Sequence, residues 1–206
     1  MIRITLPQTN KVVKSNKTVN EISLESLDFE KAKINGIKDV LFNNYFTNLI
    51  HCPSTLVGIY SIPDTVETIG IEAFSQCKGL TSVYIPSSVK TIGCLAFSHC
   101  VSLTTITLPS SIEEMGYRAL SNCIGLKSIF LKSETPLNLI PDMEVFHKIN
   151  KESCALYVPI GSKSAYQNAT QWNEFQIIVE LPVQYNIMSL LKRKYLNNSC
   201  PQGYVV

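Results

Sequence analysis

The sequence predicts an α/β solenoid of 23-residue coils, with a parallel sheet on one face and short helical or 3₁₀ turns between the strands. The main observation is an internal repeat over residues 62–84, 85–107 and 108–130, in which apolar residues, proline, glycine and cysteine recur at one spacing. A second observation is the composition, because 206 residues that are 45% hydrophobic and 17% charged suit one modest globular unit. Stacked coils bury their core between neighbours, so atypical caps are expected at both ends.

Each coil contains one predicted strand that ends at a proline. Leu80, Val83 and Ile85 are expected to point into the core. Pro86 then stops the strand because proline has no N–H for the ladder. Gly93 allows a turn that a β-carbon would hinder. One such strand per coil builds a continuous parallel sheet.

The segment after the glycine is predicted to turn the chain back with buried side chains. Ala96, Phe97 and Cys100 have near-helical spacing, which indicates a short helix or 3₁₀ turn against the core. The repeated Cys77, Cys100 and Cys123 therefore fit a buried column in which free cysteine acts as a small hydrophobic residue. Seven cysteines are an odd number, no CxxC motif occurs and only three histidines accompany them, so no metal site is predicted.

The chain divides into three predicted parts. Residues 1–61 are interpreted as an N-terminal cap with degenerate repeats. Residues 62–182 form the repeat array, which closes with a strand over residues 154–159 and a capping helix. Residues 183–206 are interpreted as a basic amphipathic tail that packs on the cap or on another chain.

The residues 85–107, IPSSVKTIGCLAFSHCVSLTTIT, resemble the BspA type of leucine-rich repeat, and the likeness extends over residues 62–130. Residues 158–178, which begin VPIGSKSAY, are similar to the C-terminal ending of many bacterial members. The resemblance implies a protein of the cell surface or a secreted protein, as in anaerobic gut and oral bacteria and some parasitic protists. It also implies a protein or glycoprotein partner, such as fibronectin, fibrinogen or another bacterium.

Motifs for catalysis or cofactor binding are lacking, so a non-enzymatic protein without a cofactor is predicted. The sequence has no GxxxxGK[ST], GxGxxG, HExxH or GxSxG motif. His99 beside Cys100 and the pair Glu113 and Glu114 are better explained as solvated residues, because neighbouring side chains diverge.

A formal charge of +2 indicates no nucleic-acid partner. Membrane contact is not expected, since no apolar run reaches the roughly 20 residues that span a bilayer. The start of the chain lacks the apolar stretch of a signal peptide.

The outward side of the predicted sheet is the candidate partner-binding face. Its side chains are aromatic and hydroxyl residues that alternate with the buried positions: Tyr84, Thr107, Phe130, Tyr157, Ser82, Thr105 and Ser128. Strand propensity alone would also favour such residues. The predicted function is adhesion or protein binding through this face. The alternative is a structural module that spaces other domains or self-associates through its tail. The oligomeric state is therefore not predicted.

Overall fold

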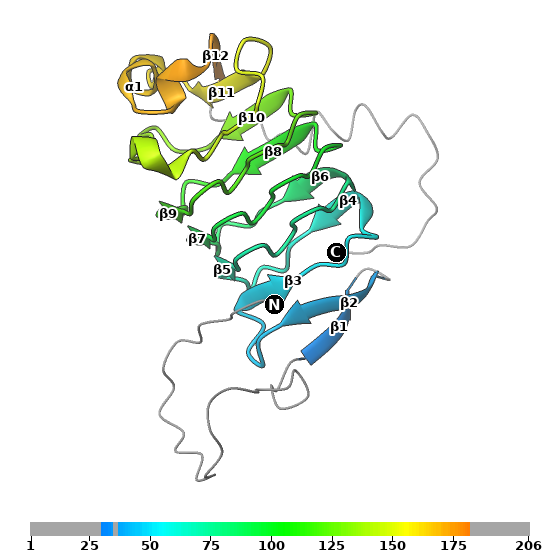
Figure 1. Cartoon of the computed structure of the whole chain (residues 1–206). Helices are drawn as coiled ribbons and strands as arrows, with labels where there is room; N and C mark the ends of the chain where they lie inside the picture. Colours follow the sequence, from blue (N-terminus) through cyan, green and yellow to red (C-terminus); the bar gives the residue numbers. More distant parts are fainter. Residues whose placement is uncertain (1–29, 35–36, 182–206) are drawn as a thin grey trace, which may run out of the picture.

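A computed structural model describes residues 30–34 and 37–181, and the chain winds through them as a solenoid (Figure 1). Successive coils stack along one axis, from the strands around residue 40 to the capping helix near residue 165. The solenoid and its parallel sheet confirm the fold class predicted from the repeat. The predicted tail, residues 183–206, lies outside the described residues.

One side of the solenoid is a sheet of six parallel strands, here called the long sheet. The strands occur in the spatial order β12, β11, β10, β8, β6, β4. Their bounds are β4 Val57–Ser61, β6 Gly79–Tyr84, β8 Thr105–Leu108, β10 Ser128–Leu131, β11 Ala155–Pro159 and β12 Ile177–Leu181. Ser82 pairs with Thr105, and Thr105 pairs with Ser128, so equivalent residues of the repeat lie side by side. The strand expected at residues 154–159 is therefore present as β11.

A second sheet, which the sequence analysis did not predict, forms another side of each coil. Its order is β1 Glu30–Ile34, β2 Ile37–Phe42, β3 Asn48–His51, β5 Thr68–Ile69, β7 Thr91–Ile92 and β9 Glu114–Met115. The first two pairings are antiparallel and the others are parallel. Coils approach so closely beside it that a β-carbon on Gly116 would collide with the backbone nitrogen of Cys94. The repeated glycine is therefore needed for stacking between coils.

The short helix or 3₁₀ turn expected after the glycine is a series of tight turns with hydrogen bonds of the 3₁₀ kind. In the central coil, Ser98 N donates to Leu95 O and Cys100 N donates to Phe97 O. Leu95 and His99 have left-handed φ angles of 56° and 61°, which a right-handed helix cannot contain. The turns are also bonded to the next coil, since Phe97 N donates to Ala119 O over 2.8 Å. Bonding between coils thus replaces the bonds that a helix would make within one coil.

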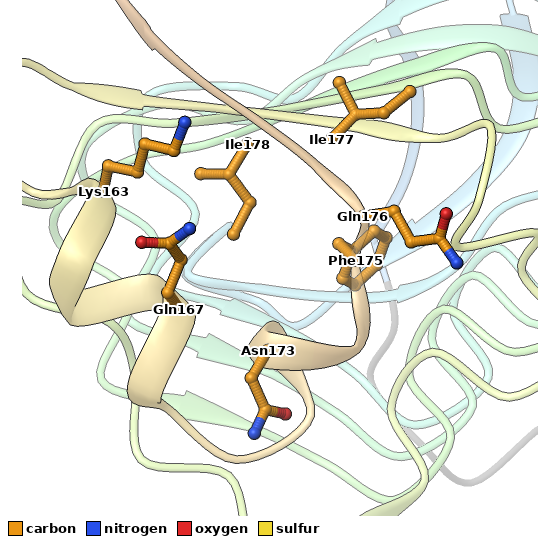
Figure 2. A pocket seen from close by; sticks show the side chains of 7 residues that line it. All are labelled: Lys163, Gln167, Asn173, Phe175, Gln176, Ile177 and Ile178. Atoms are coloured by element: carbon orange, nitrogen blue, oxygen red, sulfur yellow. The ribbon is translucent and has the colours of Figure 1, made fainter.

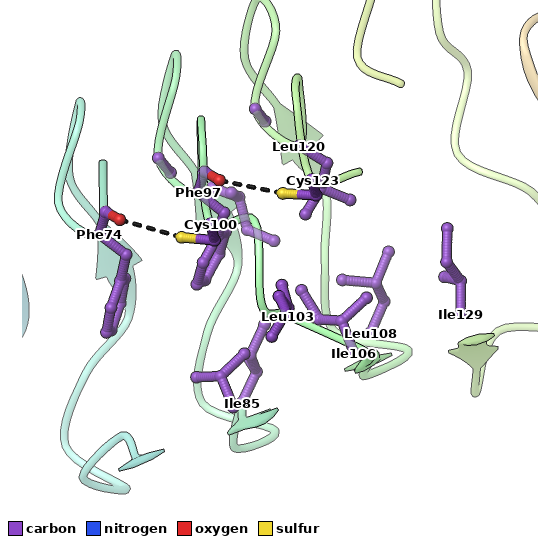
Figure 3. Packing of buried hydrophobic residues seen from close by; sticks show 14 of the residues in the cluster. Phe74, Ile85, Phe97, Cys100, Leu103, Ile106, Leu108, Leu120, Cys123 and Ile129 are labelled. Atoms are coloured by element: carbon purple, nitrogen blue, oxygen red, sulfur yellow. Dashed lines mark hydrogen bonds between the residues drawn. The ribbon is translucent and has the colours of Figure 1, made fainter. Parts of the chain in front are cut away.

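The interior between the two sheets and the turns is one continuous apolar core (Figure 3). The residues predicted to point inward, among them Leu80, Val83, Ile85 and Phe97, are all buried. Phe74 and Phe97 of neighbouring coils stack with ring centroids 4.8 Å apart and planes 10° apart. Each coil thus contributes side chains that only the next coil can cover.

The cysteine column is part of this core, as predicted. Cys77, Cys100 and Cys123 are fully buried. The Sγ atoms of Cys100 and Cys123 each lie 3.1 Å from a carbonyl oxygen of the preceding coil, on Phe74 and Phe97 respectively (Figure 3). Each of these carbonyls also accepts a backbone N–H from its own coil, so the weak S–H donor adds a second bond that links neighbouring coils.

The C-terminal end of the array is closed by a short helix and an aromatic cluster. After β11 the chain forms α1 Lys163–Asn168, η3 Trp172–Glu174 and finally β12; η2 Pro141–Met143 lies in the insertion before β11. The ring of Trp172 packs edge-on against Tyr166 and Phe146. Glu180 of β12 accepts hydrogen bonds from the backbone nitrogens of Gly161 and Lys163 at the start of α1. Strand and helix are thereby held together at the end of the solenoid.

Candidate recognition surface

The seven residues predicted to bind a partner all lie on the outer face of the long sheet, the face that points away from the core. Strand register arranges the face in two columns. The first column contains Ser61, Tyr84, Thr107, Phe130, Tyr157 and Val179, and the second contains Ile59, Ser82, Thr105, Ser128, Ala155 and Ile177. Tyr84 is exposed, and the six other predicted residues are half-buried. The structure therefore brings the predicted residues together on one surface.

An aromatic pair lies within the first column. Phe130 and Tyr157 occupy neighbouring positions on β10 and β11, and their rings stack with centroids 4.5 Å apart and planes 11° apart. Each ring restricts the other, so little conformational entropy remains to be lost when a partner covers them. Such a half-buried pair can contribute apolar contact area to binding.

The face extends onto the edge strands, which the sequence analysis missed. Val57 and Ile59 on β4 are 71% and 57% exposed, and Ile177 and Val179 on β12 are 40% and 37% exposed. Alignment of residues 57–61 and 177–181 with the repeat strands would have revealed these positions. Ile59 and Ser61 lie one repeat of 23 residues before Ser82 and Tyr84, whereas α1 and η3 separate β12 from β11 and conceal its alignment.

The two columns contain no charged side chain. Lys127 and Lys132 are exposed just before and just after β10, at the margin of this face. Covering an uncharged face requires less desolvation than covering ionised groups. Depletion of charge at the centre of a surface is typical of protein interfaces.

Ser98, His99 and Ser121 form a small hydrogen-bonded cluster away from the long sheet. The hydroxyl of Ser98 lies 2.8 Å from His99 Nδ1 and 3.0 Å from the hydroxyl of Ser121. Both serines are buried, so a substrate in solvent has no access to these oxygens. His99, Glu113 and Glu114 are exposed, in agreement with their interpretation as solvated residues. Across residues 30–34 and 37–181, no three histidine, cysteine or acidic residues gather as metal ligands.

Two hollows lie near the C-terminal end. One, of about 430 Å³, is lined by α1, η3 and β12 (Figure 2). The other, of about 180 Å³, lies between the third repeat and the cap and is lined mainly by apolar residues. Two of its polar side chains have partners in the cap, because Tyr166 Oη donates to Ser133 O and Trp172 Nε1 donates to Leu137 O. Among the described helices, none has the length and apolar character needed to cross a membrane.

Because several thiols are buried, the folded protein should lose stability at alkaline pH. Burial raises the pKa of Cys77 and that of Cys154 to about 12 each. In the unfolded chain a thiol ionises near pH 8.5, so above that pH the unfolded state binds fewer protons than the native state. The native state therefore gains stability by keeping these thiols protonated. That contribution is complete below about pH 8.5 and falls as the pH rises toward 12. The melting temperature in reducing buffer should therefore decrease between pH 9 and 11.

The Cys77→Ala variant is the control for this pH dependence. It removes one buried thiol, so its melting temperature should fall less steeply with pH than that of the unchanged chain. Equal slopes for the two proteins, or a melting temperature constant up to pH 11, would contradict the prediction.

Comparison with known families identifies the repeat. The model of the BspA type leucine-rich repeat region matches residues 54–157 with 6 copies, which is just over half of the 206 residues. The chain belongs to this family. Leucine-rich repeat proteins typically take part in protein–protein interactions, and their solenoid is typically a non-enzymatic binding scaffold. No curated protein matches the chain.

The solved structures with a similar backbone fold are of bacterial proteins. A leucine-rich repeat protein from Eubacterium ventriosum is 24% identical with a TM-score of 0.48, covering 78% of this chain and 41% of that chain. A leucine-rich cell surface protein from Faecalibacterium prausnitzii is 24% identical with a TM-score of 0.49, covering 86% of this chain and 41% of that chain. The pneumococcal vaccine antigen PcpA is 20% identical with a TM-score of 0.49, covering 77% and 49%. The chain spans less than half the length of each of these structures.

Proposed function

We propose that this chain is a non-enzymatic recognition module that binds a protein or glycoprotein through the outer face of the long sheet. The observation that carries the proposal is the uncharged double column with the stacked Phe130 and Tyr157 within it. A flat sheet without a deep cleft suits a macromolecular surface better than a small ligand. The resemblance to surface-exposed members of the family supports an adhesion role at the cell surface or in the secreted state.

Combined replacement of Tyr84, Phe130 and Tyr157 by alanine tests the proposal. The purified chain is first applied to immobilised matrix proteins, mucins and glycans, and a saturable partner is selected. Aromatic residues at the centre of an interface often contribute 2 kcal/mol or more each, which is about a 30-fold change in affinity. We therefore expect the triple variant to bind that partner at least about 100-fold more weakly.

A matched control replaces exposed apolar residues on the turns instead. Ile71, Tyr117 and Ile124 are 69%, 42% and 64% exposed and lie outside the long sheet. Their combined replacement by alanine should leave the affinity unchanged. Retained affinity in a folded Tyr84, Phe130 and Tyr157 variant, judged by its circular dichroism, would reject this face as the binding surface.

A further inference from the structure

The last strand of the long sheet has an open edge. Among the described residues, β12 pairs with β11 and has no strand on its other side (Figure 1). Natural edge strands are usually protected by outward charges, proline or a bulge. Instead, β12 exposes Ile177 and Val179, and the carboxylate of its single acidic residue, Glu180, is turned toward α1. This edge is therefore open to pairing with another strand.

The ladder determines which backbone groups face the open edge. In the preceding strands, the residues of the outer face donate their N–H to the earlier coil, as Ser128 N does to Thr104 O and Ala155 N to Lys127 O. In β12, Ile177 and Val179 continue that register against Ala155 and Tyr157. Because backbone groups alternate between the two sides of a strand, those of the intervening Ile178 and Glu180 point to the open edge.

We propose that two copies of the chain pair through β12, with the strands antiparallel and a two-fold axis at Val179. Pairing of one edge with its own copy is isologous and must be antiparallel. In this register Ile178 lies opposite Glu180 of the partner subunit, and the two residues exchange N–H to carbonyl hydrogen bonds on each side of the axis. Val179 then faces its own copy, and Ile177 faces Leu181 of the partner subunit.

Side-chain chemistry fits this register. The two-fold axis places Glu180 of the partner subunit opposite Ile178, so the two carboxylates are not directly opposed. Ile178 borders the hollow of about 430 Å³ that Lys163 and Gln167 also line (Figure 2). Pairing therefore brings an acidic residue of the partner subunit to the strand that borders Lys163, while its carboxylate keeps its bonds to the start of its own α1. On the outer face, Ile177, Val179 and Leu181 of the two copies come to lie side by side, so the pairing joins the two long sheets.

The oligomeric state of the full chain is the first test. Light scattering after size-exclusion chromatography should give a mass that rises from monomer toward dimer with increasing concentration. Val179→Lys places a charge at the two-fold axis and should raise the dimer dissociation constant at least about ten-fold. Ile71→Lys, at an exposed position on a distant turn, should leave it unchanged.

Disulfide trapping tests the register itself. The background is Cys94→Ser with Cys200→Ser, which leaves the buried thiols in the described residues. Val179→Cys places two thiols across a non-hydrogen-bonded pair, with Cα atoms about 4.5 Å apart, which suits a disulfide. Ile177→Cys introduces a cysteine at similar exposure, but the two Cα atoms are then about 13 Å apart across the axis. Mild oxidation should therefore give at least about ten-fold more covalent dimer with Val179→Cys.

Three results would overturn the proposal. They are a monomer at every concentration, a dimer insensitive to Val179→Lys, and equal trapping by Val179→Cys and Ile177→Cys. A monomer would also result if residues 182–206 covered the edge, and it rejects the pairing in that case too. A melting curve of each variant serves to establish that it is folded. Pairing through β12 does not depend on partner binding through the outer face, so each of the two proposals can be rejected without the other.

Discussion

Phe97→Ala is expected to lower the free energy of unfolding by about 3 to 5 kcal/mol, because it removes a fully buried ring that the fold cannot fill by collapse. The ring stacks on Phe74 of the preceding coil, and the backbone around it is bonded to the following coil at Ala119. Neighbouring coils are therefore held at a fixed spacing, and the cavity should persist. Denaturant unfolding followed by circular dichroism measures the change.

Phe130→Ala is the matched control for this cavity. Phe130 is a phenylalanine on the outer face of the long sheet and is only half-buried. Its replacement leaves no closed cavity, so the destabilisation should be clearly smaller than at Phe97. Equal losses for the two variants would show that burial between coils is not what stabilises the array.

Trp172→Ala should destabilise the C-terminal cap by about 3 to 5 kcal/mol. Trp172 is buried, lies 4.8 Å from the ring of Phe146 and 5.5 Å from that of Tyr166, and donates its indole N–H to Leu137 O. It thus joins the insertion before β11 to the helix after it. Its replacement leaves both a cavity and an unpaired carbonyl. Hydrogen exchange of β11, α1 and β12 measures the local loss.

Trp172→Phe distinguishes packing from the hydrogen bond. It retains most of the ring but no N–H donor, so we expect roughly 1 to 3 kcal/mol of the loss to remain. Because each coil contacts only its neighbours, exchange in β6 and β8 should change less than in the cap. Unaltered protection of the cap in Trp172→Ala would mean that the aromatic cluster does not hold it.

The repeat in the sequence was sufficient to predict the solenoid, the long sheet and its inward residues. A residue that recurs every 23 positions must take the same place in each coil, so Leu80 and Val83 of the strand and Phe97 of the turn were identified as core without coordinates. The same alternation predicted that Tyr84, Phe130 and Tyr157 would share the outer face. Their role in binding stays a prediction, because periodicity determines which way a side chain points and carries no information about a partner.

Only the tertiary structure revealed the second sheet, the tight turns and the open edge of β12. Two-residue strands such as Thr91–Ile92 are too short for a periodic signal and form because the next coil supplies the bonding partners. The left-handed turns at Leu95 and His99 are stabilised by hydrogen bonds between coils, which local spacing cannot show. In the same way, the register of β12 against β11 decides that Ile177 and Val179 face outward, since a shift by one residue would have buried them.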